Sequence, residues 1–221
     1  MIENGYSIYS QFGEDGILQY LIDKLKLSNK QCCEFGMSGI QFSNTYNLVE
    51  NYEWYGVYIE KNNTILSTIK FGTKINKEVE SSGKNTLDNI LKDTKLSKHF
   101  DILSIDVDGK DYHIWNSLTE YNPNVVIIEI NPFINPNEDY INDGSRFSSS
   151  FKSTTELGKQ KGYTLVCMSG NLIFVRTELL IGTELEYLIK SNPNNLFLND
   201  AIMVNDKEIS FKRFIKKTKL I

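Results

Sequence analysis

The sequence predicts an α/β protein built around a mostly parallel sheet, and three observations support this prediction. Short apolar runs alternate with stretches of helical periodicity, as in parallel strands joined by right-handed helical crossovers. The run at 125–130 is almost entirely apolar and β-branched, which is typical of a strand buried on both faces of a sheet. Apolar runs at 163–168 and 172–176 flank a Ser-Gly-Asn turn, which predicts an antiparallel hairpin.

The first half of the chain predicts helices, a glycine turn and three strands. A polar segment at 5–16 precedes apolar residues at helical spacing, which predicts a helix over 17–27. A short apolar run at 31–35 stops at the turn 36–39 and predicts a strand that enters a glycine loop. The other elements expected here are a helix that begins at Ser43 or Asn44 and runs to Glu50, strands at 55–59 and 73–76, and a helix at 63–71.

The second half of the chain predicts two further strands before the hairpin, at 100–105 and 125–130. Helices are expected at 86–91 and 112–118. The segment 131–150 is long and polar, and in a compact domain such a loop is typically a lid, a binding loop or a disordered segment. Because it has few apolar anchors, we expect it to be mobile without ligand and to gain order when an acceptor binds.

Composition and charge restrict the class of protein. At 221 residues, with 40 % hydrophobic and 24 % charged residues, the chain is long enough for one large domain and too apolar to be disordered. Its net charge of −4 disfavours a general nucleic-acid partner, since nothing supplies a field that neutralises phosphates. No apolar run approaches the roughly 18 residues of a membrane helix, and no secretory signal pattern is present. We therefore expect a cytoplasmic protein without a membrane span.

The three cysteines, Cys32, Cys33 and Cys167, indicate neither a disulfide framework nor a zinc site. Their number is odd, two are adjacent in an apolar run, and their spacing to the two histidines matches no zinc pattern. We expect all three to be buried thiols that pack as small hydrophobic side chains in a reducing compartment.

Acidic residues follow or end four of the predicted strands. In an open parallel sheet, ligands bind beyond the carboxyl ends of the strands, so these residues are expected to meet in one crevice. The set comprises Glu34 with Gly36, Ser38 and Gly39 after the first strand, Glu60 after the second, Asp106 with Asp108 after the fourth, and Glu129 with Asn131 after the fifth.

The glycine loop and Glu60 together favour a nucleoside ligand. Gly36 and Gly39 allow a ligand to approach the backbone closely, although a plain tight turn explains the pair equally well. A carboxylate placed like Glu60 accepts both hydroxyls of a ribose in nucleotide-binding folds. Gln41 and Phe42 stand where the dinucleotide fingerprint has its third glycine. This departure disfavours NAD and favours a nucleoside cofactor without a pyrophosphate.

Asp106, Asp108 and His113 are the candidates for the chemistry itself. Two close carboxylates serve as ligands for a hard cation or as an acid/base group with a raised pKa. The alternative is that Asp108 or Asp111 only caps a helix. The unperturbed pKa of histidine suits His113 to proton abstraction, although a lone histidine is more often structural. The polar cluster at 10–15 either caps the first helix or folds over the cofactor.

Several short segments, taken together and in order, resemble one known family. They are SQFGEDG at 10–16, CEFG at 33–36 with SNT at 43–45, GVYIE at 56–60, DILSIDVDG at 101–109, VIIEINP at 126–132, and GYTLV at 162–166 with NLIFVR at 171–176. This ordered set resembles the FkbM-like methyltransferases, a branch of the class I S-adenosylmethionine-dependent methyltransferases. The resemblance implies a Rossmann-like class I fold, with a mostly parallel seven-stranded sheet and a C-terminal antiparallel hairpin.

The same resemblance implies the domain organisation. The chain, 1–221, is expected to be a single methyltransferase domain whose core over 6–176 matches the family. The remaining residues, 177–221, are expected to form a C-terminal helical extension.

The resemblance also assigns a cofactor, S-adenosylmethionine. It implies that Glu34 and the loop 36–39 hold the methionine portion and that Glu60 holds the ribose hydroxyls. It places Asp106 beside the transferred methyl group. Three residues within or beside the matching segments are further candidates for cofactor binding, namely Gln11, Ser38 and Asn44.

The Asp-x-Asp-Gly sequence that begins at Asp106 is also similar to the metal-binding segment of macrocin-type sugar O-methyltransferases, which implies a Mg²⁺ site on Asp106 and Asp108. FkbM-like enzymes methylate hydroxyls of sugars or polyketides, so we expect a small-molecule or glycan acceptor beside Asp108, Glu129 and Asn131. Either Asp106 or His113 is then the base that removes the hydroxyl proton. Two other classes stay open, a catalytically inactive nucleoside-binding module and a nucleotide-dependent oxidoreductase. The sequence leaves the oligomeric state open.

Overall fold

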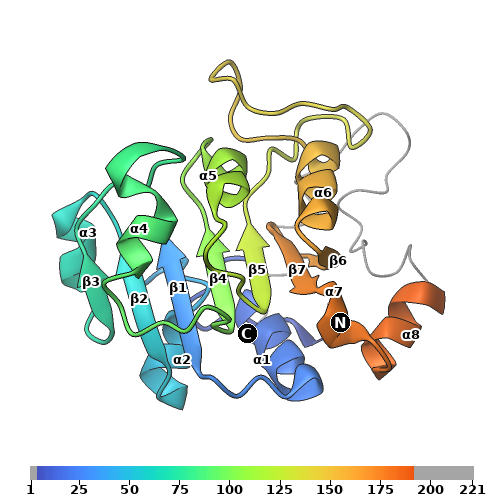
Figure 1. Cartoon of the computed structure of the whole chain (residues 1–221). Helices are drawn as coiled ribbons and strands as arrows, with labels where there is room; N and C mark the ends of the chain where they lie inside the picture. The colour runs from blue at the N-terminus through green and yellow to red at the C-terminus, as the bar shows by residue number, and fades with distance from the viewer. Residues whose placement is uncertain (1–3, 192–221) are drawn as a thin grey trace.

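The computed structural model describes residues 4–191, and its centre is a seven-stranded sheet in the order β3-β2-β1-β4-β5-β7-β6 (Figure 1). The strands from β1 to β5 run parallel, and β7 pairs antiparallel with both β5 and β6. This confirms the predicted α/β class, the mostly parallel sheet and the C-terminal hairpin. The strands are β1 (Gln31–Phe35), β2 (Tyr55–Ile59), β3 (Thr73–Ile75), β4 (Ile102–Ile105), β5 (Val125–Ile128), β6 (Tyr163–Met168) and β7 (Leu172–Arg176).

Helices cover both faces of the sheet, so the described chain forms three layers (Figure 1). One face packs against α4, α5 and α6, and the other face packs against α1, α2 and α3 together with α7 and α8. The helices are α1 (Glu14–Leu25), α2 (Tyr46–Tyr52), α3 (Asn63–Thr68), α4 (Leu87–Leu91), α5 (Asp111–Ser117), α6 (Phe151–Gln160), α7 (Thr177–Leu180) and α8 (Glu184–Ser191), with a short 3₁₀ turn η2 (Gly83–Asn85).

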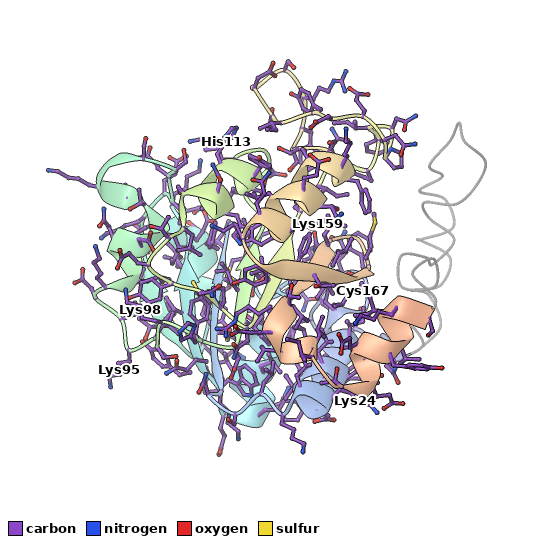
Figure 2. The ribbon with its side chains drawn as sticks, turned by 45° about the vertical axis from the view of Figure 1, so that its right-hand side comes forward. Lys24, Lys95, Lys98, His113, Lys159 and Cys167 are labelled. Atoms are coloured by element: carbon purple, nitrogen blue, oxygen red, sulfur yellow. The ribbon has the colours of Figure 1, made fainter. Side chains whose placement is uncertain are left out.

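Each face of the sheet has its own hydrophobic core. Successive side chains of a strand point to opposite faces, so the neighbours Cys32 and Cys33 of β1 belong to different cores. All three cysteines are free and buried, as the sequence predicts, and burial raises the pKa of their thiols. Cys167 is labelled on β6 in Figure 2.

The sequence prediction omits α6, a helix with few apolar residues. Ser150 caps it, because its Oγ accepts a hydrogen bond from the backbone N–H of Ser153 at 3.2 Å. A Cβ built on Gly158 would lie 2.5 Å from Cε1 of Phe174, so the absence of a side chain lets α6 lie close against β7. Tertiary packing therefore stabilises this helix, and the spacing of apolar residues in its sequence does not predict it.

The long polar loop lies where the sequence places it, and the C-terminal helical extension stays a prediction. The segment 131–150 contains no helix or strand. The described part of the predicted C-terminal extension contains α7 and α8, and the rest of it, 192–221, lies outside the described residues, as do residues 1–3.

Candidate functional site

A cavity of about 560 Å³ lies at the carboxyl ends of β1, β2, β3 and β4. This is the edge of the sheet where a parallel arrangement places its ligand site. The residues that line it are Phe35, Gly36, Met37, Ser38, Ile59, Glu60, Lys61, Asn62, Ile65, Lys77, Glu78, Val79, Val107, Asp108 and Lys110. Four sequence-predicted site residues, Gly36, Ser38, Glu60 and Asp108, are thus brought together in one cavity.

Gly36 is required by the protein's own packing. Its φ is +82°, and a Cβ built on it would lie 1.7 Å from the carbonyl oxygen of Asp106. The sequence predicts that a ligand approaches this glycine closely, whereas the close neighbour in the structure is the backbone at the end of β4. Gly39 also has a positive φ, +129°, but a Cβ there would meet only Thr68 Oγ1, at 3.7 Å.

The carboxylate of Glu34 is engaged by the loop that leads into α2. It accepts hydrogen bonds from Ser43 Oγ at 2.6 Å, the Asn44 N–H at 2.8 Å, and the Thr45 N–H and Oγ1 at 3.1 and 2.7 Å. Burial raises the pKa of Glu34, and these hydrogen bonds oppose the rise. Ser43 Oγ in turn accepts a hydrogen bond at 3.0 Å from the N–H of Tyr46, the first residue of α2. A contact between Glu34 and a cofactor stays a prediction, because both oxygens already serve to order this loop.

Asp15 holds the segment before α1 through hydrogen bonds. Its Oδ2 accepts hydrogen bonds from the backbone N–H groups of Ile8, Tyr9 and Ser10 at 2.8 to 2.9 Å, and from Ser10 Oγ at 2.8 Å. Gln11, which is predicted to bind the cofactor, follows this hydrogen-bonded segment and is exposed.

The side chain of Asn44, which is also predicted to bind the cofactor, points into the protein interior. Its Nδ2 donates to Ser104 Oγ of β4 at 3.0 Å, and the side chain is buried.

Glu60 ends β2 and presents a carboxylate to the cavity. Its Oε1 accepts a hydrogen bond from the Asn62 N–H at 2.8 Å, and Oε2 accepts none from any described residue. The side chain has therefore one oxygen fixed by the backbone and a second oxygen available to a ligand.

Three carboxyl groups meet beside the cavity. Oxygens of Asp106, Asp108 and Glu129 all lie within 4.8 Å of one another. Burial raises the pKa of Asp106 and of Glu129, and repulsion from the neighbouring carboxylates raises both further. Oε2 of Glu129 is buried without a hydrogen-bond partner among the described residues. The group can hold a proton near neutral pH or supply oxygen ligands to a hard cation.

Asp111 braces the turn that carries Asp108. Its Oδ1 accepts from the Val107 N–H at 2.8 Å and its Oδ2 from the Gly109 N–H at 2.9 Å. Ser148 Oγ of the long loop also donates to Oδ2, at 3.1 Å. Neither aspartate caps α5 with its side chain, so the capping alternative is wrong and Asp111 instead orders the turn before the helix.

His113 contacts the long loop rather than the acidic group. Its Nε2 lies 2.7 Å from the carbonyl oxygen of Asn142, and since a carbonyl only accepts, Nε2 is the donor. Figure 2 shows His113 on α5, at the end of the molecule where the loop 131–150 rises above the sheet. A role for His113 as the base stays a prediction that would require Nδ1.

Asn131 has both ends of its side-chain amide engaged within the loop. Its Oδ1 accepts from the Phe133 N–H at 3.0 Å, and its Nδ2 donates to the Phe147 carbonyl. Both polar atoms of the Asn131 side chain therefore already have partners, and the residue orders the loop. A contact between Asn131 and a substrate stays a prediction.

The sequence reading missed two features of this site. Glu129 lies beside Asp106 and Asp108 as expected, because β4 and β5 are neighbours and end together, but the sequence did not identify it as a third possible metal ligand. On the rim of the cavity, Glu78 forms ion pairs with Lys61 and Lys110, each at 3.3 Å. These three residues follow different strands, so no local motif announces the pairing.

The fold and this cavity define an α/β protein with a cavity at the carboxyl ends of its parallel strands. Residues 33–165, more than half of the chain, match the family model of the methyltransferase FkbM domain. The chain therefore belongs to the FkbM methyltransferase family, as its motifs indicate, and its sheet is consistent with a methyltransferase-like fold. No curated protein matches it in a sequence search. Among the described helices, none is long and apolar enough to span a membrane.

Proposed function

We propose that this methyltransferase uses S-adenosylmethionine to methylate a hydroxyl of a sugar or glycan-related small molecule. The observation that carries the proposal is the cavity at the ends of β1 to β4, in which Glu60 offers an unengaged carboxylate oxygen. Its volume of about 560 Å³ falls within the range of small-molecule sites. The resemblance assigns the ribose hydroxyls to Glu60, and the geometry supports that assignment.

The electrostatics of the site fit a cationic cofactor. Asp106 is surrounded by other carboxyl groups, with Asp111, Asp108, Glu34 and Glu14 all raising its pKa after burial itself. A sulfonium ion relieves this repulsion, whereas a pyrophosphate adds to it. S-adenosylmethionine supplies, when bound, a methyl group on a positively charged sulfur.

The chain's own part in the reaction is to orient the acceptor and accept its proton. A raised pKa gives Asp106 the basicity to remove a proton from a hydroxyl near neutral pH, which a solvated aspartate lacks. Asp108 and Glu129 flank Asp106 and are the residues that we assign to the acceptor. We keep His113 as the second candidate for the base.

A hard cation is the other chemistry that the same three carboxyl groups support. Their oxygens converge, and Glu129 Oε2 has no other partner among described residues, so Asp106, Asp108 and Glu129 fit as ligands of Mg²⁺. A bound metal lowers the pKa of a coordinated hydroxyl and replaces the need for a strong base. Chelation distinguishes the two chemistries.

The test begins with the cofactor. Calorimetric titration with S-adenosylmethionine, with S-adenosylhomocysteine and with NAD identifies the ligand, and saturation by NAD alone would indicate an oxidoreductase. A mass-spectrometric screen of nucleotide sugars and glycan fragments for a mass increase of one CH₂ group then tests methyl transfer. Tight cofactor binding without transfer to any acceptor in the screen would favour the inactive nucleoside-binding module.

A further inference from the structure

Hydrogen bonds that the proposed reaction does not use join the loop 131–150 to α5 and to the turn 107–110, which carries Asp108. Asn142 Nδ2 donates to the Gly109 carbonyl at 2.8 Å. Ser148 Oγ donates to Asp111 at 3.1 Å, and His113 donates to the Asn142 carbonyl at 2.7 Å. The loop is thus tied to the segment that carries Asp106 and Asp108.

Asn142 is itself held in one orientation. Its backbone N–H donates to Ser149 Oγ at 3.0 Å, and its Oδ1 accepts from the Gly144 N–H at 2.8 Å and from the Tyr140 hydroxyl at 3.2 Å. The residue is 9 % exposed. With a donor facing Oδ1 and a carbonyl facing Nδ2, the direction of the amide is fixed by its partners.

The turn that Asn142 holds forms one wall of the cavity. Gly109 lies between Asp108 and Lys110, and both of these neighbours line the cavity while Asn142 does not. Asp108 and Gly109 have φ values of +54° and +130°. A left-handed conformation is uncommon for a residue other than glycine, although aspartate tolerates it better than most, so contacts that hold the turn favour this conformation. A Cβ on Gly109 would lie 2.7 Å from Asn142 Nδ2, so the contact also requires glycine there.

We propose that Asn142 is a positioning residue that couples the loop 131–150 to the cofactor pocket. It holds the turn 107–110 in the conformation that presents Asp108 and Lys110 to the cavity. The proposal rests on the proposed cofactor site. Because a coupling between two sites is reciprocal, cofactor binding orders the loop in turn, so that the acceptor side of the site is completed after the cofactor has bound.

Calorimetric titration with S-adenosylmethionine tests the coupling. Asn142→Ala is expected to weaken binding about three- to tenfold, the effect of one buried hydrogen bond. Asn142→Asp keeps an oxygen for the Oδ1 contacts but sets a charged carboxylate oxygen against the Gly109 carbonyl in place of the donor, so it is expected to weaken binding at least as much. Asn137→Ala, an exposed asparagine in the same loop whose side chain makes no hydrogen bond with a described residue, is the matched control. Equal affinities for wild type and both Asn142 variants would overturn the proposal.

A double-mutant cycle separates positioning from general loosening of the structure. If Asn142 acts through the turn, Asn142→Ala has a smaller effect on affinity in an Asp108→Ala background than in wild type. Additive effects of the two substitutions would contradict the proposal.

Amide hydrogen exchange gives a readout that does not need the cofactor. In the free protein, Asn142→Ala is expected to speed exchange at 107–110, and Asn137→Ala is not. With S-adenosylmethionine, exchange at 139–149 is expected to slow in wild type and to change less in Asn142→Ala. If wild type fails to bind this cofactor, the proposed function fails, whereas unchanged exchange at 107–110 in the free variant overturns the role of Asn142.

Discussion

The carbonyl oxygen of Asp106 occupies the space where a side chain at Gly36 would begin. A Cβ built there would lie 1.7 Å from this oxygen, and the φ of Gly36 is +82°. The ends of β1 and β4 therefore meet at a glycine, with the Asp106 N–H donating to the Phe35 carbonyl at 3.3 Å. The position of the acidic group depends on this contact, because Asp106 can take its place only if position 36 has no side chain.

Gly36→Ala is accordingly expected to destabilise the protein strongly. The positive φ alone costs an alanine roughly 1–2 kcal/mol, and the clash with Asp106 adds to it because the neighbour is backbone that cannot rotate away. We expect a loss of at least about 2 kcal/mol in the free energy of unfolding, measured by urea denaturation. Gly83→Ala is the control, since its φ is +81° but a Cβ there meets nothing within 4 Å. Equal losses in the two variants would mean that the contact with Asp106 does not matter.

Glu60→Gln tests the proposed cofactor site. The substitution keeps an acceptor for the Asn62 N–H and removes the charge that faces the cavity. Loss of a charged acceptor costs about 1.5–3 kcal/mol, so affinity for S-adenosylmethionine is expected to fall at least tenfold. Calorimetric titration measures it, with Glu80→Gln, an exposed glutamate outside the cavity lining, as the control. An unchanged dissociation constant would remove Glu60 from the cofactor site.

Asp106→Asn tests the chemistry. The variant keeps the shape and removes the charge, so turnover is expected to fall by about 10²–10⁴-fold, far more than affinity for the cofactor. Sensitivity of wild type to a chelator, restored by Mg²⁺, would assign the carboxyl group to a metal. Indifference to chelator, with a rate that titrates, would assign it to a base. Near-normal turnover in Asp106→Asn would exclude both roles, and His113→Ala would then be the variant to measure.

The strands and the edge of the sheet that carries the site follow from local sequence. The apolar runs at 31–35 and 55–59 and in the hairpin coincide with β1, β2, β6 and β7, because buried strands need continuous apolar residues. The placement of Glu60 and Asp108 at one cavity follows from the parallel order of these strands.

The remaining features depend on contacts between segments far apart in the chain. α6 forms because Gly158 lets it lie against Phe174, which no periodicity reveals. Glu34 and Asn131 lie at strand ends, where ligand contacts are expected, but their side-chain polar atoms form hydrogen bonds with loop residues. The local sequence does not predict the conformation of these loops. The partner of Gly109, Asn142, is 33 positions away in the chain, so only the fold identifies it.

Glu14 predicts how stability depends on pH. It is fully buried at the start of α1, where its oxygens accept hydrogen bonds from Ser169 Oγ at 2.6 Å and the Phe12 N–H at 2.8 Å. Burial raises its pKa in the folded protein. Above the unfolded pKa of about 4.3, the unfolded chain releases this proton more readily than the folded chain does. The contribution of Glu14 to stability is therefore present at low pH and is lost as pH rises toward its folded pKa.

Glu14→Gln is expected to remove this dependence. Glutamine accepts from the Phe12 N–H and donates to the Ser169 hydroxyl, so it keeps both contacts without an ionisable group. The free energy of unfolding, measured in urea at about pH 4.5 and at about pH 7.5, should shift in favour of the variant as pH rises above the unfolded pKa. Glu184→Gln is a control of opposite sign, because the exposed pair with Lys24 lowers the pKa of Glu184 and adds stability only above its unfolded pKa. A Glu14→Gln variant whose stability relative to wild type is the same at both pH values would show that Glu14 titrates alike in the folded and unfolded chain.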